Sequence, residues 1–266
     1  MRDAKAGGII SSRLESCLNI AMGHLSIAVT GIRRAAPSTD GEPQPSSGTT
    51  AILDWQSPAF EAWAAGLDQT IADDHEFLRQ AHGFIQRAIT PVYAVNDLQS
   101  VTATISRGRG SCSQRLAVLE ALGRRRGMPT RVRGLLVYGS FWYPSFGRIR
   151  FLVPQQVLLA WPEFLVNGNW LNVSALFDGG DGNLTPFTNR GAETLFDAVA
   201  RGAANWETAG TPPCDCETQD LSGFLRRDLG VFAARDELFG RYGQTLPTLI
   251  RWLIDPVFSR WSAGRS

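Results

Sequence analysis

Residues 110–133, GSCSQRLAVLEALGRRRGMPTRVR, decide the fold of this chain. Leucines recur in this stretch every three residues, which places them on one face of an α-helix. Gly127 and the Met-Pro pair after it end a helix, because glycine favours a helix C-terminus and proline cannot continue one. The stretch therefore predicts a loop, a helix that opens at Cys112, a stop at Gly127 and then a strand.

The predicted helix carries Cys112 at its N-terminus. Unpaired backbone N–H groups and the positive end of the helix dipole favour a thiolate there, and the thiolate is the nucleophilic form of cysteine. A free cysteine is also often a small buried hydrophobic residue. Both interpretations of Cys112 remain open from the residues alone.

Several correlated features resemble the core of the transglutaminase-like superfamily of cysteine enzymes. They are the Gly-Ser-Cys loop with its helix, Arg124, the GMPTR run at 127–131, and LAWPEFLVNGNWLNVS at 159–174. The resemblance implies an α+β fold, with N-terminal helices packed on an antiparallel sheet and additional helices towards the C-terminus. It also implies that a thiolate attacks an amide or thioester carbonyl, that a histidine shuttles the proton and that a carboxylate orients the histidine.

Two of the three catalytic positions implied by this resemblance are substituted. The histidine position, two residues before Trp161, is Leu159, and the aspartate position, four residues after Trp170, is Ser174. Leucine cannot accept a proton, and loss of a general base costs about 10²-fold to 10⁴-fold in rate. The carboxylate nearest in sequence to the missing one is Asp178.

The candidate site residues follow from the resemblance and from their place beside it. The charge of Arg109 or Arg115 is expected to lower the pKa of the Cys112 thiol. The aromatic run FWY at 141–143 either overhangs a pocket or forms a hydrophobic plug. The candidates are Cys112 and Asp178 as catalytic residues, and Trp161, Trp142, Tyr143 and Arg109 as substrate-binding residues.

The three histidines of the chain all precede Cys112, whereas the catalytic histidine of the superfamily follows the cysteine. His24, His75 and His82 are each expected to be surface or half-buried residues. A relocated base remains the alternative, because catalytic partners meet in space and not in sequence.

Hydrophobic periodicity predicts the remaining elements. A helix is expected from Ser57-Pro58 and a second one from Asp73 or Asp74 to Thr90-Pro91. Asn167-Gly168 is a strong hairpin signal between two strands. The expected strands are 130–138, 157–166 and 169–173. In the rest of the chain, one or two helices are expected within 9–35 and others at 190–207, 219–242 and 246–262.

The expected organisation has three parts. Residues 1–50 form an N-terminal helical segment and a Pro/Ser-rich linker, residues 51–180 form the transglutaminase-like core, and residues 181–266 form a C-terminal helical extension of the same domain.

Composition and charge narrow the classes of partner. A net charge of +1 over 266 residues argues against nucleic-acid binding. No apolar stretch is long enough to span a membrane, and charged residues interrupt the one segment that resembles a signal peptide, so a cytoplasmic protein without membrane partners is expected. Cys214 and Cys216 are too close together for the common zinc spacing, so no metal and no cofactor are expected.

Three functional hypotheses remain. The first is a cysteine-dependent acyl transferase or cyclase that acts on a thioester- or amide-linked substrate in a biosynthetic pathway, the substrate being a small molecule, a peptide or a carrier-bound group. The second is a catalytically degenerate homologue that binds a peptide, a carrier protein or a partner enzyme. The third is a non-covalent cyclase that uses the cleft as a template.

Overall fold

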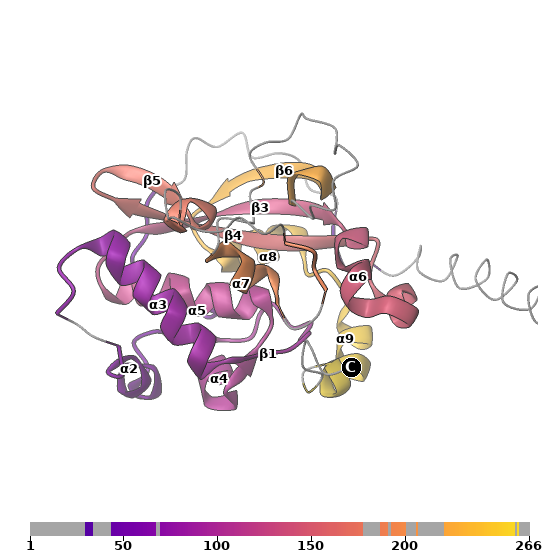
Figure 1. The fold of residues 1–266 in the computed structure, drawn as a ribbon, viewed down its shortest axis with the longest axis horizontal. Coiled ribbons are helices and arrows are strands. Elements are labelled where there is room, and N and C mark those ends of the chain that lie inside the picture. The colour runs from indigo at the N-terminus through magenta and orange to yellow at the C-terminus, as the bar shows by residue number, and fades with distance from the viewer. Residues whose placement is uncertain are drawn as a thin grey trace, which may run out of the picture.

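A four-stranded antiparallel sheet with helices packed on one face forms the core of the molecule, as Figure 1 shows. The strand order is β5-β4-β3-β6. The computed structural model describes residues 30–33, 44–67, 70–177, 187–190, 193–200, 206, 221–258 and 260. This is the α+β arrangement that the sequence predicts.

Three helices precede the cysteine helix in the described part of the chain. The first is α2 (Pro58–Ala64), where the Ser57 side chain accepts a hydrogen bond from the Phe60 amide. The second is α3 (Asp74–Ala88), which Asp73 caps in the same way. Both confirm the predicted helix starts. The third, α4 (Val101–Arg107), was not predicted, although Ser100 caps it as a helix-start residue should.

The cysteine helix α5 (Cys112–Arg125) is the central helix of the fold. The Ser111 side chain accepts from the Gln114 amide, and the Gln114 side chain accepts from the Ser111 amide, which forms a capping box. Residues 113–124 are all buried, between α3 and α4 on one side and the sheet on the other. The predicted start at Cys112 and the stop before Gly127 are both confirmed.

Short parallel strands fix the approach to α5. Strand β1 (Thr90–Pro91) leaves α3 and pairs with β2 (Arg109–Gly110), which leads directly into the helix. The segment that follows β1 is thereby held beside the helix N-terminus.

The sheet is built around β3 (Thr130–Tyr138). On one side it pairs with β4 (Gln156–Val166), which continues through a hairpin into β5 (Asn169–Asn172). The turn residues Asn167 and Gly168 both have positive φ, 51° and 78°, as a type I′ hairpin requires. The predicted hairpin is confirmed.

The other neighbour of β3 corrects a prediction. Residues 219–242 were expected to be one helix, but they form a 3₁₀ turn η4 (Leu221–Phe224), the strand β6 (Leu225–Phe232) and the helix α8 (Arg235–Tyr242). Gly230 lies at φ 88°, which no helix interior tolerates, and pairing with β3 outweighs the weak helical pattern of this segment.

The remaining described elements are mostly short. Residues 190–207 were predicted as one helix, but the described helix in that range is short, and the predicted last helix is confirmed with tighter limits. These elements are η1 (Gly139–Trp142), α6 (Tyr143–Phe146), η2 (Gly147–Leu152), η3 (Val173–Phe177), α7 (Leu195–Val199) and α9 (Thr248–Phe258).

Several predictions lie outside the described residues. They are the helices predicted within 9–29 and the residues Cys17, His24, Asp178, Cys214 and Cys216. In the part of the chain that the structure describes, every helix is too short or too polar to cross a membrane.

A buried ionic cluster joins α5 to α8 and to the start of β3. Glu120 accepts hydrogen bonds from Arg124 at 3.3 Å, from Thr130 at 2.9 Å and from Arg235 at 2.7 Å. The side chains of Glu120, Arg124 and Arg235 are at most 1% exposed. One carboxylate therefore compensates two buried guanidinium groups, which makes it hard to replace.

Candidate functional site

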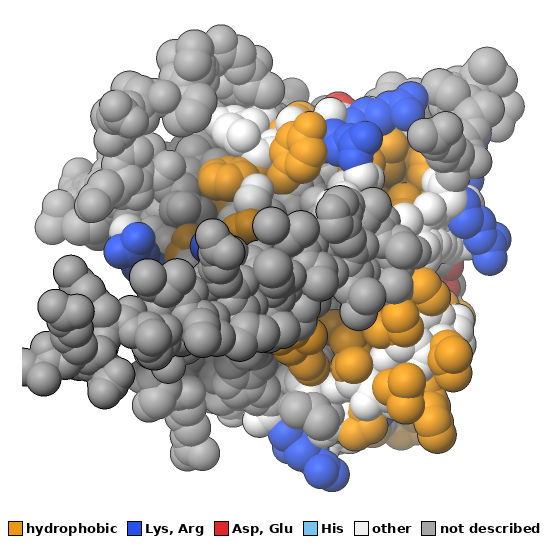
Figure 2. All heavy atoms as spheres, turned by 90° about the vertical axis from the view of Figure 1, so that its right-hand side faces the viewer, with side chains coloured by type: hydrophobic (Ala, Val, Ile, Leu, Met, Phe, Trp, Pro, Cys, Tyr) orange, Lys and Arg blue, Asp and Glu red, His pale blue; other side chains and the backbone are white. Residues whose placement is uncertain are grey.

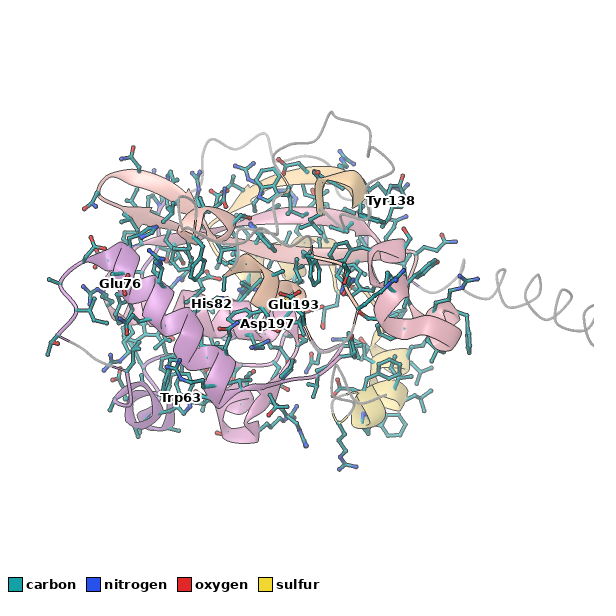
Figure 3. All side chains as sticks on the ribbon, in the orientation of Figure 1. Trp63, Glu76, His82, Tyr138, Glu193 and Asp197 are labelled. Atoms are coloured by element: carbon teal, nitrogen blue, oxygen red, sulfur yellow. The ribbon has the colours of Figure 1, made fainter. Side chains whose placement is uncertain are left out.

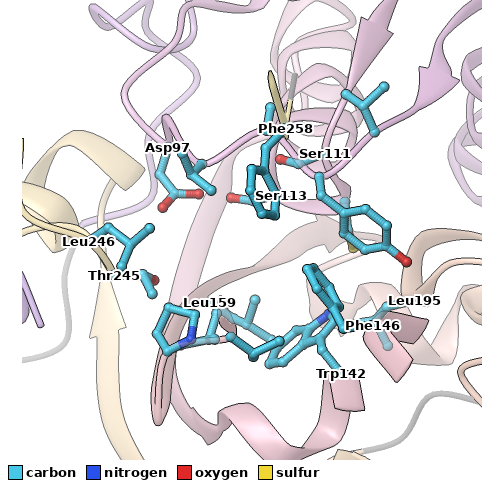
Figure 4. Close-up of a pocket in the computed structure, with 18 of the residues that line it drawn as sticks. Asp97, Ser111, Ser113, Trp142, Phe146, Leu159, Leu195, Thr245, Leu246 and Phe258 are labelled. Carbon is cyan, nitrogen blue, oxygen red and sulfur yellow. The ribbon is translucent and has the colours of Figure 1, made fainter. Parts of the chain in front are cut away.

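A cavity of about 150 Å³ lies at the N-terminus of α5, and Cys112 forms part of its wall. We refer to it as the Cys112 cavity. Its walls come from the segment after β1, from η1 and α6, from the start of β4 and from α9, as the close-up in Figure 4 shows. Segments up to about 160 residues apart in the sequence therefore meet there, including Val92 and Phe258.

The wall of the cavity is mainly apolar. Its large side chains include Trp142, Phe146, Leu159, Leu246, Ile254 and Phe258. The side chains in the wall that carry polar groups, besides Cys112, are those of Tyr93, Asp97, Ser111, Ser113, Asn189, Thr194 and Thr245. A concave apolar site with a few polar groups is typical of a ligand-binding pocket.

Apolar side chains are also exposed beside this cavity. Leu152 of η2 lines the cavity and is 45% exposed, and Phe151 beside it is 40% exposed. On α9 the outer face carries Leu249, Trp252 and Leu253, which are among the most exposed large hydrophobic residues described. Figure 2 shows hydrophobic side chains gathered on this face of the molecule.

Cys112 lies at the predicted position, the first residue of α5, but its surroundings favour the neutral thiol. Burial, with a smaller contribution from Asp197, raises the pKa of the Cys112 thiol to about 12. Arg115, Arg235 and the backbone of Phe196 act in the opposite direction without overcoming the burial. Arg115 thus has the predicted effect, but the helix terminus and the nearby charges do not compensate for the loss of water around the sulfur.

Leu159 and Ser174 are the residues at the two positions that the sequence resemblance assigns to the histidine and the carboxylate. Leu159 lies on β4, lines the cavity and is 5% exposed. Ser174 lies on η3, is buried, and its Oγ has no hydrogen-bond partner among the described residues. No imidazole lines the cavity in the described part of the chain.

The prediction that His82 is a surface or half-buried residue is wrong. The ring is fully buried, stacks on Phe196 at 4.1 Å, and places Nε2 at 2.7 Å from the Phe196 carbonyl oxygen. Burial lowers the pKa of His82 to about 4, so the ring is neutral at pH 7. Figure 3 shows His82 on α3 close to Asp197 of α7. His75, on the same helix, is half-buried as predicted.

His82 belongs to a structural cluster that fastens α7 to α3 and α5. The Arg115 guanidinium lies over the Phe196 ring at 4.2 Å and donates to the Asp197 carboxylate at 3.1 Å. Gln86 donates to the same carboxylate. The cluster explains why Arg115 is buried: its charge is neutralised by Asp197.

The predicted substrate-binding residues are separated by the fold. Trp142 lines the cavity and packs edge-on against the buried ring of Phe141. Tyr143 is exposed, Arg109 is half-buried, and Trp161 is fully buried, and none of these three lines the cavity. Of the aromatic run, one residue therefore belongs to the core and one to the cavity wall.

Sequence reasoning missed Asp97. It follows β1 and lines the cavity beside Ser113, whose hydroxyl donates a hydrogen bond to the carboxylate. Burial raises the pKa of Asp97 to about 6, although Arg235 and Arg251 act to lower it. The sequence around Asp97 carries no catalytic motif, so only the folded arrangement points to this residue.

Comparison with known proteins assigns the family of this region. The sequence pattern of the transglutaminase-like superfamily matches residues 61–175. Residues 61–175 belong to that superfamily. A search among curated proteins found no match.

Two solved structures show partial similarity to the chain. One is described as a putative cysteine protease from Cytophaga hutchinsonii, with 18% identity, a TM-score of 0.36 and coverage of 47% of this chain and 39% of that one. The other is described as a putative protease from Parabacteroides distasonis ATCC 8503, with 12% identity, a TM-score of 0.32 and coverage of 46% and 25%. This chain thus spans well under half the length of either protein.

The transglutaminase-like region carries the cysteine at the start of α5, beside the paired strands β3 and β4. The cavity beside the sulfur is mainly apolar, burial raises the pKa of the thiol, and Leu159 lines the cavity. This arrangement can enclose an apolar group, and it provides no proton acceptor beside the sulfur at the family position.

Proposed function

We propose that this chain is a catalytically degenerate transglutaminase-like protein that binds a peptide by taking an apolar side chain into the Cys112 cavity. One observation carries the proposal: Leu159, at the histidine position of the superfamily, forms part of the apolar wall around a protonated thiol. Loss of the general base lowers the rate of catalysis by about 10²-fold to 10⁴-fold, whereas binding of a ligand in the cavity does not depend on that base.

The size of the cavity supports one large apolar side chain as its occupant. Cavities of about 150 Å³ with apolar walls are known to hold a benzene-sized molecule. The exposed side chains of Leu152 and Leu253 flank this region and add apolar surface for the rest of the ligand. The resemblance to enzymes that act on amides favours a peptide over other apolar ligands.

Fluorescence anisotropy tests the proposal with a peptide of sequence Phe-Gly-Ser-Gly-Lys, amidated and labelled with fluorescein on the lysine. We expect saturable binding, and we expect Cys112→Ala to leave the affinity within about threefold because no covalent step is involved. Leu159→Trp fills the cavity and should weaken binding at least about tenfold.

Leu98→Trp is the matched control, because Leu98 is exposed and does not line the cavity. It should bind the peptide as the unmodified protein does. Binding that survives Leu159→Trp in a folded protein, or that the control abolishes equally, would show that the peptide binds elsewhere.

A second candidate function is cysteine-dependent acyl transfer. It is favoured by the place of Cys112 on the cavity wall and by the effect of Arg115, Arg235 and the Phe196 backbone on its thiolate. An activated thioester needs less assistance than an amide. Incubation with benzoyl thiocholine followed by mass spectrometry tests it, since a benzoyl adduct on Cys112 at neutral pH would favour this candidate over the binding protein.

A further inference from the structure

Asp97 places a carboxylate on the wall of the Cys112 cavity, where an apolar side chain would not require one. The Asp97 backbone is held in place because its N–H donates to Gln244 Oε1 at 2.9 Å. The Ser113 hydroxyl donates to the carboxylate. Figure 4 shows Asp97 and Ser113 facing each other at one end of the cavity, with Leu159 and Trp142 across from them.

Arg235 and Arg251, whose charges act to lower the pKa of Asp97, donate hydrogen bonds to other groups, although Arg235 Nη2 and Arg251 Nε have no partner among the described residues. Arg235 donates to Glu120 Oε2 at 2.7 Å and to the Ser113 carbonyl at 3.3 Å. Arg251 donates to Asn96 Oδ1 at 3.3 Å and to Thr248 Oγ1 at 3.1 Å. Among the residues that the structure describes, none forms an ion pair with Asp97.

The Asp97 carboxylate therefore has unused capacity to accept hydrogen bonds. A carboxylate offers about four lone-pair sites, and the Ser113 hydroxyl occupies one of them. The pKa of Asp97, raised by burial to about 6, still leaves the group mostly ionised at pH 7. Asp97 is half-buried, and a carboxylate that is partly shielded from water gains more from an incoming cation than a fully exposed one does.

We propose that Asp97 and Ser113 bind the protonated α-amino group of a peptide whose first side chain fills the apolar part of the Cys112 cavity. The inference rests on the proposed function and narrows its ligand to peptides with a free N-terminus. An α-ammonium group supplies three donors in one compact group and is charged at neutral pH. It also lies on the same residue as the first side chain, so a single residue satisfies both ends of the cavity.

The test compares the labelled peptide described above with its N-acetylated form at pH 7. We expect the free peptide to bind at least about tenfold more tightly, because a charge-assisted hydrogen bond to a desolvated carboxylate is lost on acetylation. Asp97→Asn should reduce this preference to about threefold or less. Glu76→Gln removes one negative charge from an exposed helix position and should keep the full preference.

Each outcome separates this inference from the proposed function. Equal binding of the two peptides by the unmodified protein, or a preference that survives Asp97→Asn, overturns the inference and leaves the proposed function standing. If neither peptide binds, both fail. If Asp97→Asn does not fold, as judged by circular dichroism, Ser113→Ala replaces it and should reduce the preference in part; an undiminished preference then overturns the inference.

Discussion

The reactivity of Cys112 tests the most important property of the site, its protonated thiol. The variant to use carries Cys17→Ser, Cys214→Ser and Cys216→Ser, which leaves Cys112 as the only thiol of the chain. With a pKa of about 12, about 10⁻⁵ of the thiol is ionised at pH 7. A free cysteine, with a pKa of about 8.5, is roughly 3% ionised at that pH.

The ratio of these thiolate populations is about 3,000, but the more basic thiolate is also the stronger nucleophile. A Brønsted coefficient of about 0.4–0.5 over roughly 3.5 pKa units returns a factor of about 40. We therefore expect the folded protein to react with dithiodipyridine at pH 7 about 100-fold more slowly than the same variant unfolded in guanidinium chloride.

Absorbance of the released thiopyridone gives both rates, and the pH profile separates acidity from access. Poor access alone lowers the rate by a constant factor, whereas a raised pKa makes the rate climb about tenfold per pH unit to at least pH 10. A rate that levels off below pH 8.5, or a folded rate at pH 7 that matches the unfolded one, would refute the reasoning and favour a cysteine enzyme.

Three further predictions concern the scaffold, and unfolding in guanidinium chloride measures each of them. Glu120→Gln leaves Arg124 and Arg235 buried without their counter-charge and should lower the free energy of unfolding by about 3–5 kcal/mol. The control is Glu61→Gln, which breaks an ion pair whose carboxylate is half-exposed, and it should cost less than about 1 kcal/mol. A similar loss in both variants would contradict the role given to the cluster. The pKa of His82 is lowered to about 4 in the folded state, so between pH 6.5 and pH 4 the unfolded state binds a proton that the folded state does not. The contribution of His82 to the free energy of unfolding is therefore complete above pH 6.5. As the pH falls to 4, up to about 3 kcal/mol of it is lost. His82→Phe keeps the stacking on Phe196 and should remove this part of the acid sensitivity, and an unchanged pH profile would show that His82 does not cause it. Finally, a Cβ at position 139 would clash with the Pro154 carbonyl oxygen, so Gly139→Ala should cost at least about 2 kcal/mol. Gly240→Ala on α8, where a Cβ meets open space, should be neutral or stabilising, and equal effects of the two substitutions would argue against the close approach at Gly139.

The elements that were predictable are those whose signals are local. The Gly127 stop, the spacing of the leucines in α5 and the Asn167-Gly168 turn each determine a few neighbouring residues, and the structure has these features where the sequence places them. β6 was missed because its strand character comes from pairing with β3, which lies almost a hundred residues earlier in the chain.

The chemical state of the site was less predictable than its position. The sequence placed Cys112 on the helix and Leu159 on the neighbouring strand, but it gave no measure of the burial that governs the thiol pKa. Asp97 is positioned by hydrogen bonds from its backbone N–H to Gln244 and from the Ser113 hydroxyl to its carboxylate. Gln244 is remote from Asp97 in the sequence, and a single sequence without a motif does not reveal that the two residues are in contact.

The residues that enclose the Cys112 cavity are far apart in the sequence, and this affects when the cavity can form during synthesis of the protein. Since the wall residues run in sequence from Val92 to Phe258, the pocket is incomplete until α9 has been synthesised and has docked. A ligand held there connects early and late parts of the polypeptide, so occupancy should fasten α9 in place and slow its digestion by proteases.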